Sequence, residues 1–271
     1  MRCLGPLLLS AAVAGWAFLA PVARAQDGLA SAAIIDGWDA GGGVRMAALR
    51  LDLAPGWKTY WRSPGEGGIP PLFDWSASGN LGAVRVHWPL PEVWTTNGLR
   101  AIGYDGTLIL PVEVRAADPG RPVVLAVVAD IGVCADICQP ARIAIGPVSI
   151  GGARGPEAGA IAAALAARPV AGASAGVAAA TCRTEPVPGG LRLVAELVAP
   201  PLGAAEVAVI EADVPGLWVS EARASRHGPV LRAEAEVHAT GGGGVLLDRE
   251  RITITVLAPG RGYEWRGCGA G

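Results

Sequence analysis

Short apolar runs separated by turn residues dominate the chain after residue 30. The run from Val44 to Leu53 alternates apolar and polar positions over its second half, as a strand with one solvated face does. Turn sequences such as PGW, SPGEGG and YDG divide the runs and leave no room for crossover helices. The pattern predicts strands at Val44–Leu53, Val84–Trp88, Leu108–Val114, Val123–Val128, Ile143–Ile150, Leu191–Val198, Val207–Ala212, Val230–Val237 and Ile252–Leu257.

A change of composition at residues 151–179 separates the strand-rich runs into two groups. This segment is rich in Ala and Gly, and only Pro156–Arg168 has helical composition, with Pro169 just beyond its end. We therefore predict an all-β protein with two antiparallel β-sandwich domains, at residues 28–150 and 180–271. An Ala/Gly-rich linker with one short helix joins them.

The first 25 residues have the three parts of a secretory signal peptide. Arg2 precedes an apolar run at residues 4–19, and Ala23 and Ala25 form an A-x-A cleavage site, so we expect a mature chain that begins near Gln26. A retained membrane anchor is the alternative, and it would need a longer run with a stop-transfer pattern. We expect localisation in the periplasm and no membrane insertion after the signal is removed.

The charge balance and the motifs exclude several classes of function. Removal of residues 1–25 takes two of the 22 basic residues and none of the 24 acidic ones, which makes the net charge more negative than −2. Nucleic acid and anionic lipid are therefore not expected partners. The sequence has no Ser-His-Asp arrangement, phosphate loop or dinucleotide fingerprint, so we expect no cofactor and no independent turnover of a small molecule.

Four of the five cysteines remain once Cys3 is removed with the signal, an even number that favours two disulfides in an oxidising compartment. The spacing suggests the pairs Cys134–Cys138 and Cys182–Cys268. The second pair brackets the second group of strands, and closing a loop of this length contributes about 4–5 kcal/mol in the chain-entropy model. We interpret Cys182–Cys268 as a structural disulfide.

The pair Cys134 and Cys138 lies in a different setting. The ring it closes is so short that the same model gives only roughly 2 kcal/mol before any strain. A neighbouring second thiol makes the resolution of a mixed disulfide intramolecular, and it makes the disulfide reversible. The pair therefore predicts a redox-active site in a tight turn between two strands, with a purely structural local disulfide as the alternative.

The sequence around the pair contains acids but no lysine or histidine. Asp130 and Asp136 flank Cys134, and we interpret them as solvated turn carboxylates, with activation of the thiol left to a partner. Zinc or copper would need further ligands, and the three histidines have no ligand-like spacing to either cysteine. We expect no metal.

Four ordered motifs carry a family resemblance. Over residues 35–150 the chain resembles the amino-terminal periplasmic domain of the DsbD/ScsB thiol-disulfide interchange proteins, and residues 180–271 resemble, more weakly, a second sandwich domain of some ScsB-like members. The motifs are PGWKTYWRSPGEGGIPPLFDW (Pro55–Trp75), VHWPLPEVW (Val86–Trp94), GYDGTLILPVEV (Gly103–Val114) and CADICQP (Cys134–Pro140).

The resemblance implies immunoglobulin-like sandwiches and a role in electron transfer. Such a domain takes electrons from a membrane-embedded thiol reductase and passes them to thioredoxin-like or other disulfide-bearing periplasmic proteins. By position, Cys138 resembles the cysteine that forms the mixed disulfide and Cys134 the one that resolves it. The segment Trp94–Gly103 matches the place of a cap loop, so Leu99 and Ile102 are candidate covering side chains. The sequence has nothing like the family's membrane and thioredoxin-like domains, so the reductant would be a separate polypeptide.

Our prediction is a periplasmic thiol-disulfide interchange protein; as an enzyme it would be a protein-disulfide reductase acting on protein thiols. The alternative is a non-catalytic periplasmic interaction or assembly protein whose disulfides are both structural. A third hypothesis is a carbohydrate-binding surface of stacked aromatic rings, against which core packing is the more common role of such residues. The tryptophans concerned are Trp57, Trp61, Trp75, Trp88 and Trp94.

Overall fold

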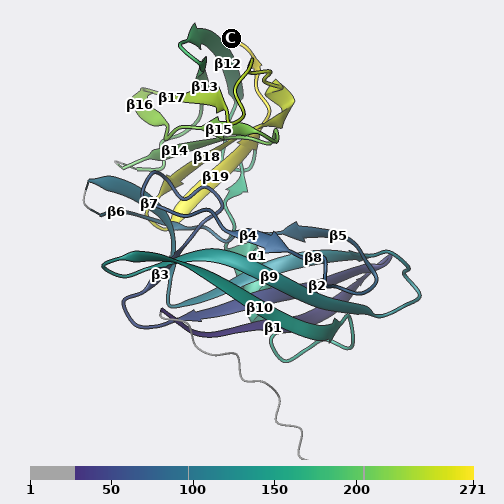
Figure 1. Cartoon of the computed structure of the whole chain (residues 1–271). Coiled ribbons are helices and arrows are strands. Elements are labelled where there is room, and N and C mark those ends of the chain that lie inside the picture. Colours follow the sequence, from purple (N-terminus) through teal and green to yellow (C-terminus); the bar gives the residue numbers. More distant parts are fainter. Residues whose placement is uncertain (1–27, 97, 204) are drawn as a thin grey trace, which may run out of the picture.

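The computed structural model describes residues 28–96, 98–203 and 205–271 (Figure 1), so the predicted signal peptide lies outside the described residues. Strands dominate, and they form four mainly antiparallel sheets, which confirms the predicted all-β fold class. The helix α1 (Ala158–Ala166) lies between the two groups of sheets in sequence. In the described part of the chain, no helix has the length and apolar character needed to cross a bilayer.

Ten strands build the first sandwich. One sheet has the order β1-β2-β8-β5, and the other has the order β10-β9-β3-β7-β6 with β4 beside β9. The strands are β1 (Leu29–Gly41), β2 (Val44–Leu53), β3 (Lys58–Tyr60), β4 (Leu72–Asp74), β5 (Leu81–Val86), β6 (Glu92–Thr96), β7 (Leu99–Asp105), β8 (Thr107–Ala116), β9 (Val123–Cys134) and β10 (Cys138–Ile150).

The core of the first sandwich lies between its two sheets. Leu49 and Leu51 of β2 and Leu125 of β9 are fully buried there, as alternate positions on facing strands. Met46 and Ala48 are also buried, although they lie on the opposite face of β2. The helix α1 packs on β1 and β8, the two neighbours of β2, and so covers that face. This cover explains why the first half of β2 lacks clear alternation in sequence.

The second sandwich contains the remaining strands. One sheet has the order β11-β19-β18-β14, and the other has the order β15-β17-β13-β12-β20 with β16 beside β17. The elements are β11 (Val170–Ala171), β12 (Ala179–Val187), β13 (Gly190–Val198), β14 (Val207–Ala212), β15 (Leu217–Val219), β16 (Arg223–His227), β17 (Val230–Ala239), the 3₁₀ turn η1 (Arg249–Arg251), β18 (Ile252–Ala258), β19 (Arg261–Arg266) and β20 (Gly269–Ala270).

The two sandwiches touch through apolar packing as well as hydrogen bonds. Val209 of β14 and Leu257 of β18 belong to the core cluster of the first sandwich, and Leu90 packs against the same cluster. The backbone N–H of Leu90 donates to the carbonyl of Ala167, just after α1, at 2.8 Å. Figure 1 shows the second sandwich standing over the part of the first that carries β6 and β7. The residues just after β3 and at the start of β7 lie close to the second sandwich.

Candidate functional site

The hairpin between β9 and β10 carries the first cysteine pair. Cys134 ends β9 and Cys138 begins β10, the two are register partners, and a disulfide joins them. The turn residues between them are exposed, Cys138 is exposed, and Cys134 is half-buried. The hairpin that carries the disulfide is therefore open to an approaching protein.

A row of four side chains crosses the sheet at this level. Cys138 is paired with Cys134, Cys134 with Lys58 of β3, and Lys58 with Asp105 of β7. Register partners of antiparallel strands share one face, with Cβ atoms about 4.5–5.5 Å apart. The sequence interpretation that no lysine lies near the pair is wrong, because the pairing of β3 with β9 brings the single lysine of the chain beside Cys134.

An aromatic ring holds the ammonium group of Lys58. Its Nζ lies 4.5 Å from the ring centroid of Trp94 on β6, within the range of a cation–π interaction. Lys58 itself is half-buried. The ammonium group is thus held on the face of the sheet that carries the disulfide, on the side of β3 that faces β6. A cation on this face favours the ionised form of a thiol that it can approach.

Tyr60, also on β3, contacts the second sulfur directly. Its hydroxyl lies 2.9 Å from Cys138 Sγ and 3.2 Å from the carbonyl oxygen of Gly67. Both atoms can only accept, so the single hydroxyl hydrogen of Tyr60 is shared between them. Burial raises the pKa of Tyr60, which is 3% exposed, and the hydroxyl stays protonated at neutral pH. The ring lies against Gly132, where a Cβ would come within 2.7 Å of it.

The candidate cap residues lie on the β6–β7 hairpin. Ile102 is buried in the core of the first sandwich, and its backbone N–H donates to the carbonyl of Pro64. Leu99 is 46% exposed, and a Cβ placed on Gly67 would come within 3.3 Å of its Cβ. The Ser63–Gly68 loop connects this hairpin to Tyr60 through these contacts. A covering role of Leu99 and Ile102 stays a prediction.

The two acids beside the pair differ in exposure, and Asp130 is half-buried. Asp136 lies in the exposed turn, and Asp130 pairs with Arg142 across the β9–β10 hairpin at 3.0 Å. The ion pair offsets part of the negative charge that Asp130 brings to the thiols. Within the ranges that the structure describes, no group of three or more His, Cys, Asp or Glu side chains is placed to hold a metal ion.

The second disulfide has the opposite environment. Cys182 on β12 is fully buried in the core of the second sandwich, and Cys268 packs against that core. The bond links residues that are 86 positions apart. Its burial and its long loop fit a bond that stabilises the fold, whereas the Cys134–Cys138 bond lies within reach of other proteins.

The five tryptophans of the carbohydrate-binding hypothesis do not form an exposed platform in the described structure. Trp61 is fully buried, and the other four are half-buried, with Trp57, Trp75 and Trp88 packed against the first core. Stacking on a sugar needs an accessible ring face. This burial argues against the carbohydrate-binding hypothesis.

Comparisons with known proteins agree with these features. Residues 32–145 match the family described as "Thiol:disulfide interchange protein DsbD, N-terminal". The fold is similar to the crystal structure of the N-terminal periplasmic domain of ScsB from Proteus mirabilis, with a TM-score of 0.60 and 22% sequence identity. That similarity covers 89% of this chain and 92% of the ScsB chain, and so includes both sandwiches. No curated protein sequence matches the chain.

Proposed function

We propose that the protein, whose residues 32–145 match the amino-terminal DsbD family, is a periplasmic thiol-disulfide interchange protein. Its Cys134–Cys138 pair carries electrons from a membrane-embedded thiol reductase to thioredoxin-like or other disulfide-bearing proteins. The predicted signal peptide and the similarity to a periplasmic domain of ScsB support this location. The observation that carries the proposal is an exposed Cys138 whose sulfur contacts the protonated hydroxyl of Tyr60.

The greater exposure of Cys138 supports the role of attacking cysteine that the family resemblance implies for it, with Cys134 as the resolving cysteine. The thiolate of Cys138 attacks a partner disulfide, and one partner sulfur leaves as a thiolate. The thiolate of Cys134 then attacks Cys138 Sγ in the mixed disulfide, which releases the second partner thiol. Two electrons pass to the partner, and the pair becomes a disulfide that the dithiol of the reductase reduces again. The sulfurs carry both electrons, so no cofactor takes part.

Two neighbouring groups favour these steps. Tyr60 donates a hydrogen bond to Cys138 Sγ, and the same hydrogen bond to a thiolate would be charge-assisted and stronger. Lys58 lies across the strand pair from Cys134 and stabilises negative charge on that sulfur when it is released or when it attacks. Each sulfur therefore has its own stabilising partner on β3.

The reduction potential of Cys134–Cys138 separates this function from a non-catalytic assembly role. We expect a value more positive than about −300 mV, in the range of thiol-disulfide oxidoreductases, from equilibration with dithiothreitol or glutathione buffers. The buried Cys182–Cys268 bond, measured alone in a Cys134→Ala/Cys138→Ala variant, is the internal comparison and should lie well below that value. A Cys134–Cys138 potential as low as that of Cys182–Cys268 would identify a structural bond and contradict the proposal.

A further inference from the structure

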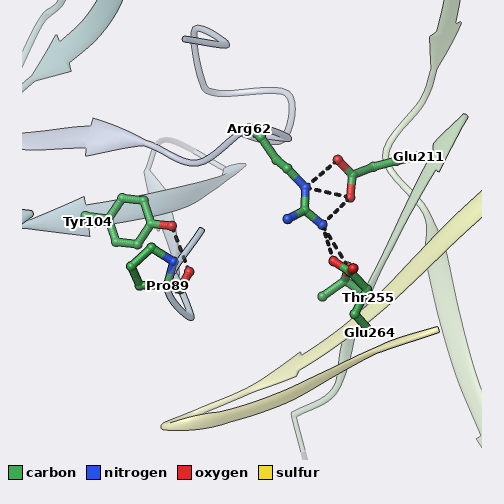
Figure 2. Close-up of polar contacts among 6 residues, drawn as sticks. All are labelled: Arg62, Pro89, Tyr104, Glu211, Thr255 and Glu264. Carbon is green, nitrogen blue, oxygen red and sulfur yellow. Dashed lines mark hydrogen bonds and ion pairs between the residues drawn. The ribbon is translucent and has the colours of Figure 1, made fainter. Parts of the chain in front are cut away.

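An arginine two residues after Tyr60 joins the first sandwich to the second. Arg62 Nε lies 2.8 Å from Glu211 Oε1, and its Nη2 lies 2.8 Å from Glu211 Oε2 and 2.6 Å from Glu264 Oε2 (Figure 2). Burial alone would lower the pKa of Arg62, but Glu211 and Glu264 raise it above its ordinary value. The guanidinium therefore stays charged between two carboxylates of the second sandwich.

A second arginine makes an ion pair at the start of β7. Arg100 Nη1 lies 2.6 Å from Glu221 Oε1, and both side chains are largely buried. The backbone carbonyl of Arg100 accepts a hydrogen bond from the N–H of Gly67 at 3.0 Å. The carbonyl of Gly67 accepts in turn from Tyr60, whose hydroxyl reaches Cys138 Sγ. Direct contacts thus connect Glu221 of the second sandwich with the redox site.

Close packing makes this connection stiff. A Cβ on Gly65 would come within 2.6 Å of the carbonyl oxygen of Arg100, and a Cβ on Gly68 within 2.8 Å of the Tyr60 ring. The Ser63–Gly68 loop is therefore held between β7 and the Tyr60 ring with no space for side chains at these points. Because close-packed groups do not shift independently, a displaced Arg100 would displace the loop and the Tyr60 hydroxyl.

A cleft of about 580 Å³ lies between the loop and the second sandwich. Arg62, Arg100, Glu211 and Glu221 are among the residues that line it. Val209, which belongs to the core of the first sandwich, also lines this cleft. The ion pairs of Arg62 and Arg100 therefore lie beside apolar packing, and they are the charged contacts of this part of the boundary.

We propose that the second sandwich positions the Tyr60 hydroxyl against Cys138 through Arg62 and Arg100. Both arginines act as positioning residues, and neither touches the sulfurs. This inference rests on the proposed function, because Cys138 is taken as the attacking cysteine. It assigns the second sandwich a role in the reactivity of the pair besides its own folding.

The test uses the full mature chain with Cys134→Ala, so that Cys138 is the single thiol. The rate of Cys138 alkylation by iodoacetamide is measured against pH. Tyr60→Phe should lower the rate at pH 7 roughly tenfold by removing the donor to the thiolate. Arg100→Glu places like charges opposite Glu221 and should lower the rate at least about threefold, with the midpoint of the pH profile moved upward.

The charge exchange Arg100→Glu with Glu221→Arg should restore the rate and the midpoint. Arg62→Gln should move the midpoint in the same direction as Arg100→Glu. Arg232→Glu breaks a surface pair with Glu196 in the second sandwich and is the matched control, which should leave the profile unchanged. Circular dichroism and thermal unfolding confirm that each variant is folded.

An unchanged midpoint in folded Arg100→Glu and Arg62→Gln, or in Tyr60→Phe, would overturn the inference. Failure of the charge exchange to restore the profile in a folded protein would overturn it as well. These outcomes are independent of the proposed function, since alkylation needs no protein partner. If the profiles shift as expected but Cys138 exchanges with no thiol protein, the proposed function fails while the positioning role stands.

Discussion

Lys58 lies directly across the β3–β9 strand pair from Cys134, on the face of the sheet that carries the disulfide. Trp94 holds its ammonium group there. A positive charge on this face favours the thiolate, and both its position over the Trp94 ring and its partial exposure to solvent weaken the effect. The half-buried cysteine of the pair thus has a cationic neighbour that its own segment of sequence does not contain.

Removal of this charge should slow the reactions of Cys134. In a Cys138→Ala background, Lys58→Met is expected to raise the Cys134 pKa and to lower its alkylation rate at pH 7 by roughly threefold to tenfold. Lys58→Arg keeps the cation and should retain most of the rate. If the Cys138→Ala protein showed the same pH profile of Cys134 alkylation with and without Lys58→Met, the charge of Lys58 would not act on Cys134.

The hydroxyl of Tyr60 should affect electron transfer as well as alkylation. With both cysteines present, Tyr60→Phe destabilises the Cys138 thiolate, and we expect reduction of a protein disulfide to slow by roughly tenfold at pH 7. The difference should shrink at high pH, where Cys138 is ionised without help. Stopped-flow measurement of the intrinsic fluorescence change at several pH values tests this, and a pH-independent loss of rate would contradict the hydrogen-bond explanation.

Ile137, between the two cysteines, presents an apolar side chain to solvent, with 73% of its area exposed. An exposed apolar side chain at the reacting hairpin suits contact with another protein. Ile137→Asp should slow exchange with a thioredoxin-like protein disulfide by roughly tenfold and leave exchange with oxidised glutathione nearly unchanged. Leu246→Asp, at a leucine of the second sandwich that is 86% exposed, is the matched control. Equal slowing with both substrates would show damage to the site itself.

His87 links the stability of the protein to pH. Burial lowers its pKa, and the guanidinium of Arg168, 3.0 Å from Nδ1, lowers it further. The folded protein therefore binds a proton at this site less readily than the unfolded chain, so the free energy of unfolding should fall as the pH drops through 6.5. Urea unfolding at pH 7.5 and 5.5 measures the difference in the free energy of unfolding between these pH values. His87→Gln should make this difference smaller, whereas His227→Gln, at an exposed histidine, should leave it unchanged.

Local patterns predicted much of the fold. The strands β2 and β14 begin and end at the predicted residues, because turn residues bound each strand-like run on both sides. The edge strand β1 escaped prediction since its pairing with β2 shifts register at three places, which breaks the period-two pattern. The predicted helix is two residues longer at each end than α1.

The site was predictable only as far as it is local. Cys134 and Cys138 are neighbours in sequence, so their spacing indicated the pair. Lys58 and Tyr60 reach the pair because β3 pairs with β9, which lies far from it in sequence. The sequence does show that the two residues are two positions apart and so share one face of a strand. The contact of Arg62 with Glu211 spans 149 positions, and no local pattern indicates it.

The trapping of mixed disulfides tests the central claim most directly. In the exporting cell, thiols are quenched with acid and alkylated, and complexes of the Cys134→Ala variant are separated without reductant. The proposed exchange predicts discrete mixed disulfides through Cys138, while Cys138→Ala and the double variant form far fewer. Absence of such complexes under a supply of reducing equivalents, or equal complexes in all three variants, would contradict a role of this pair in thiol-disulfide exchange.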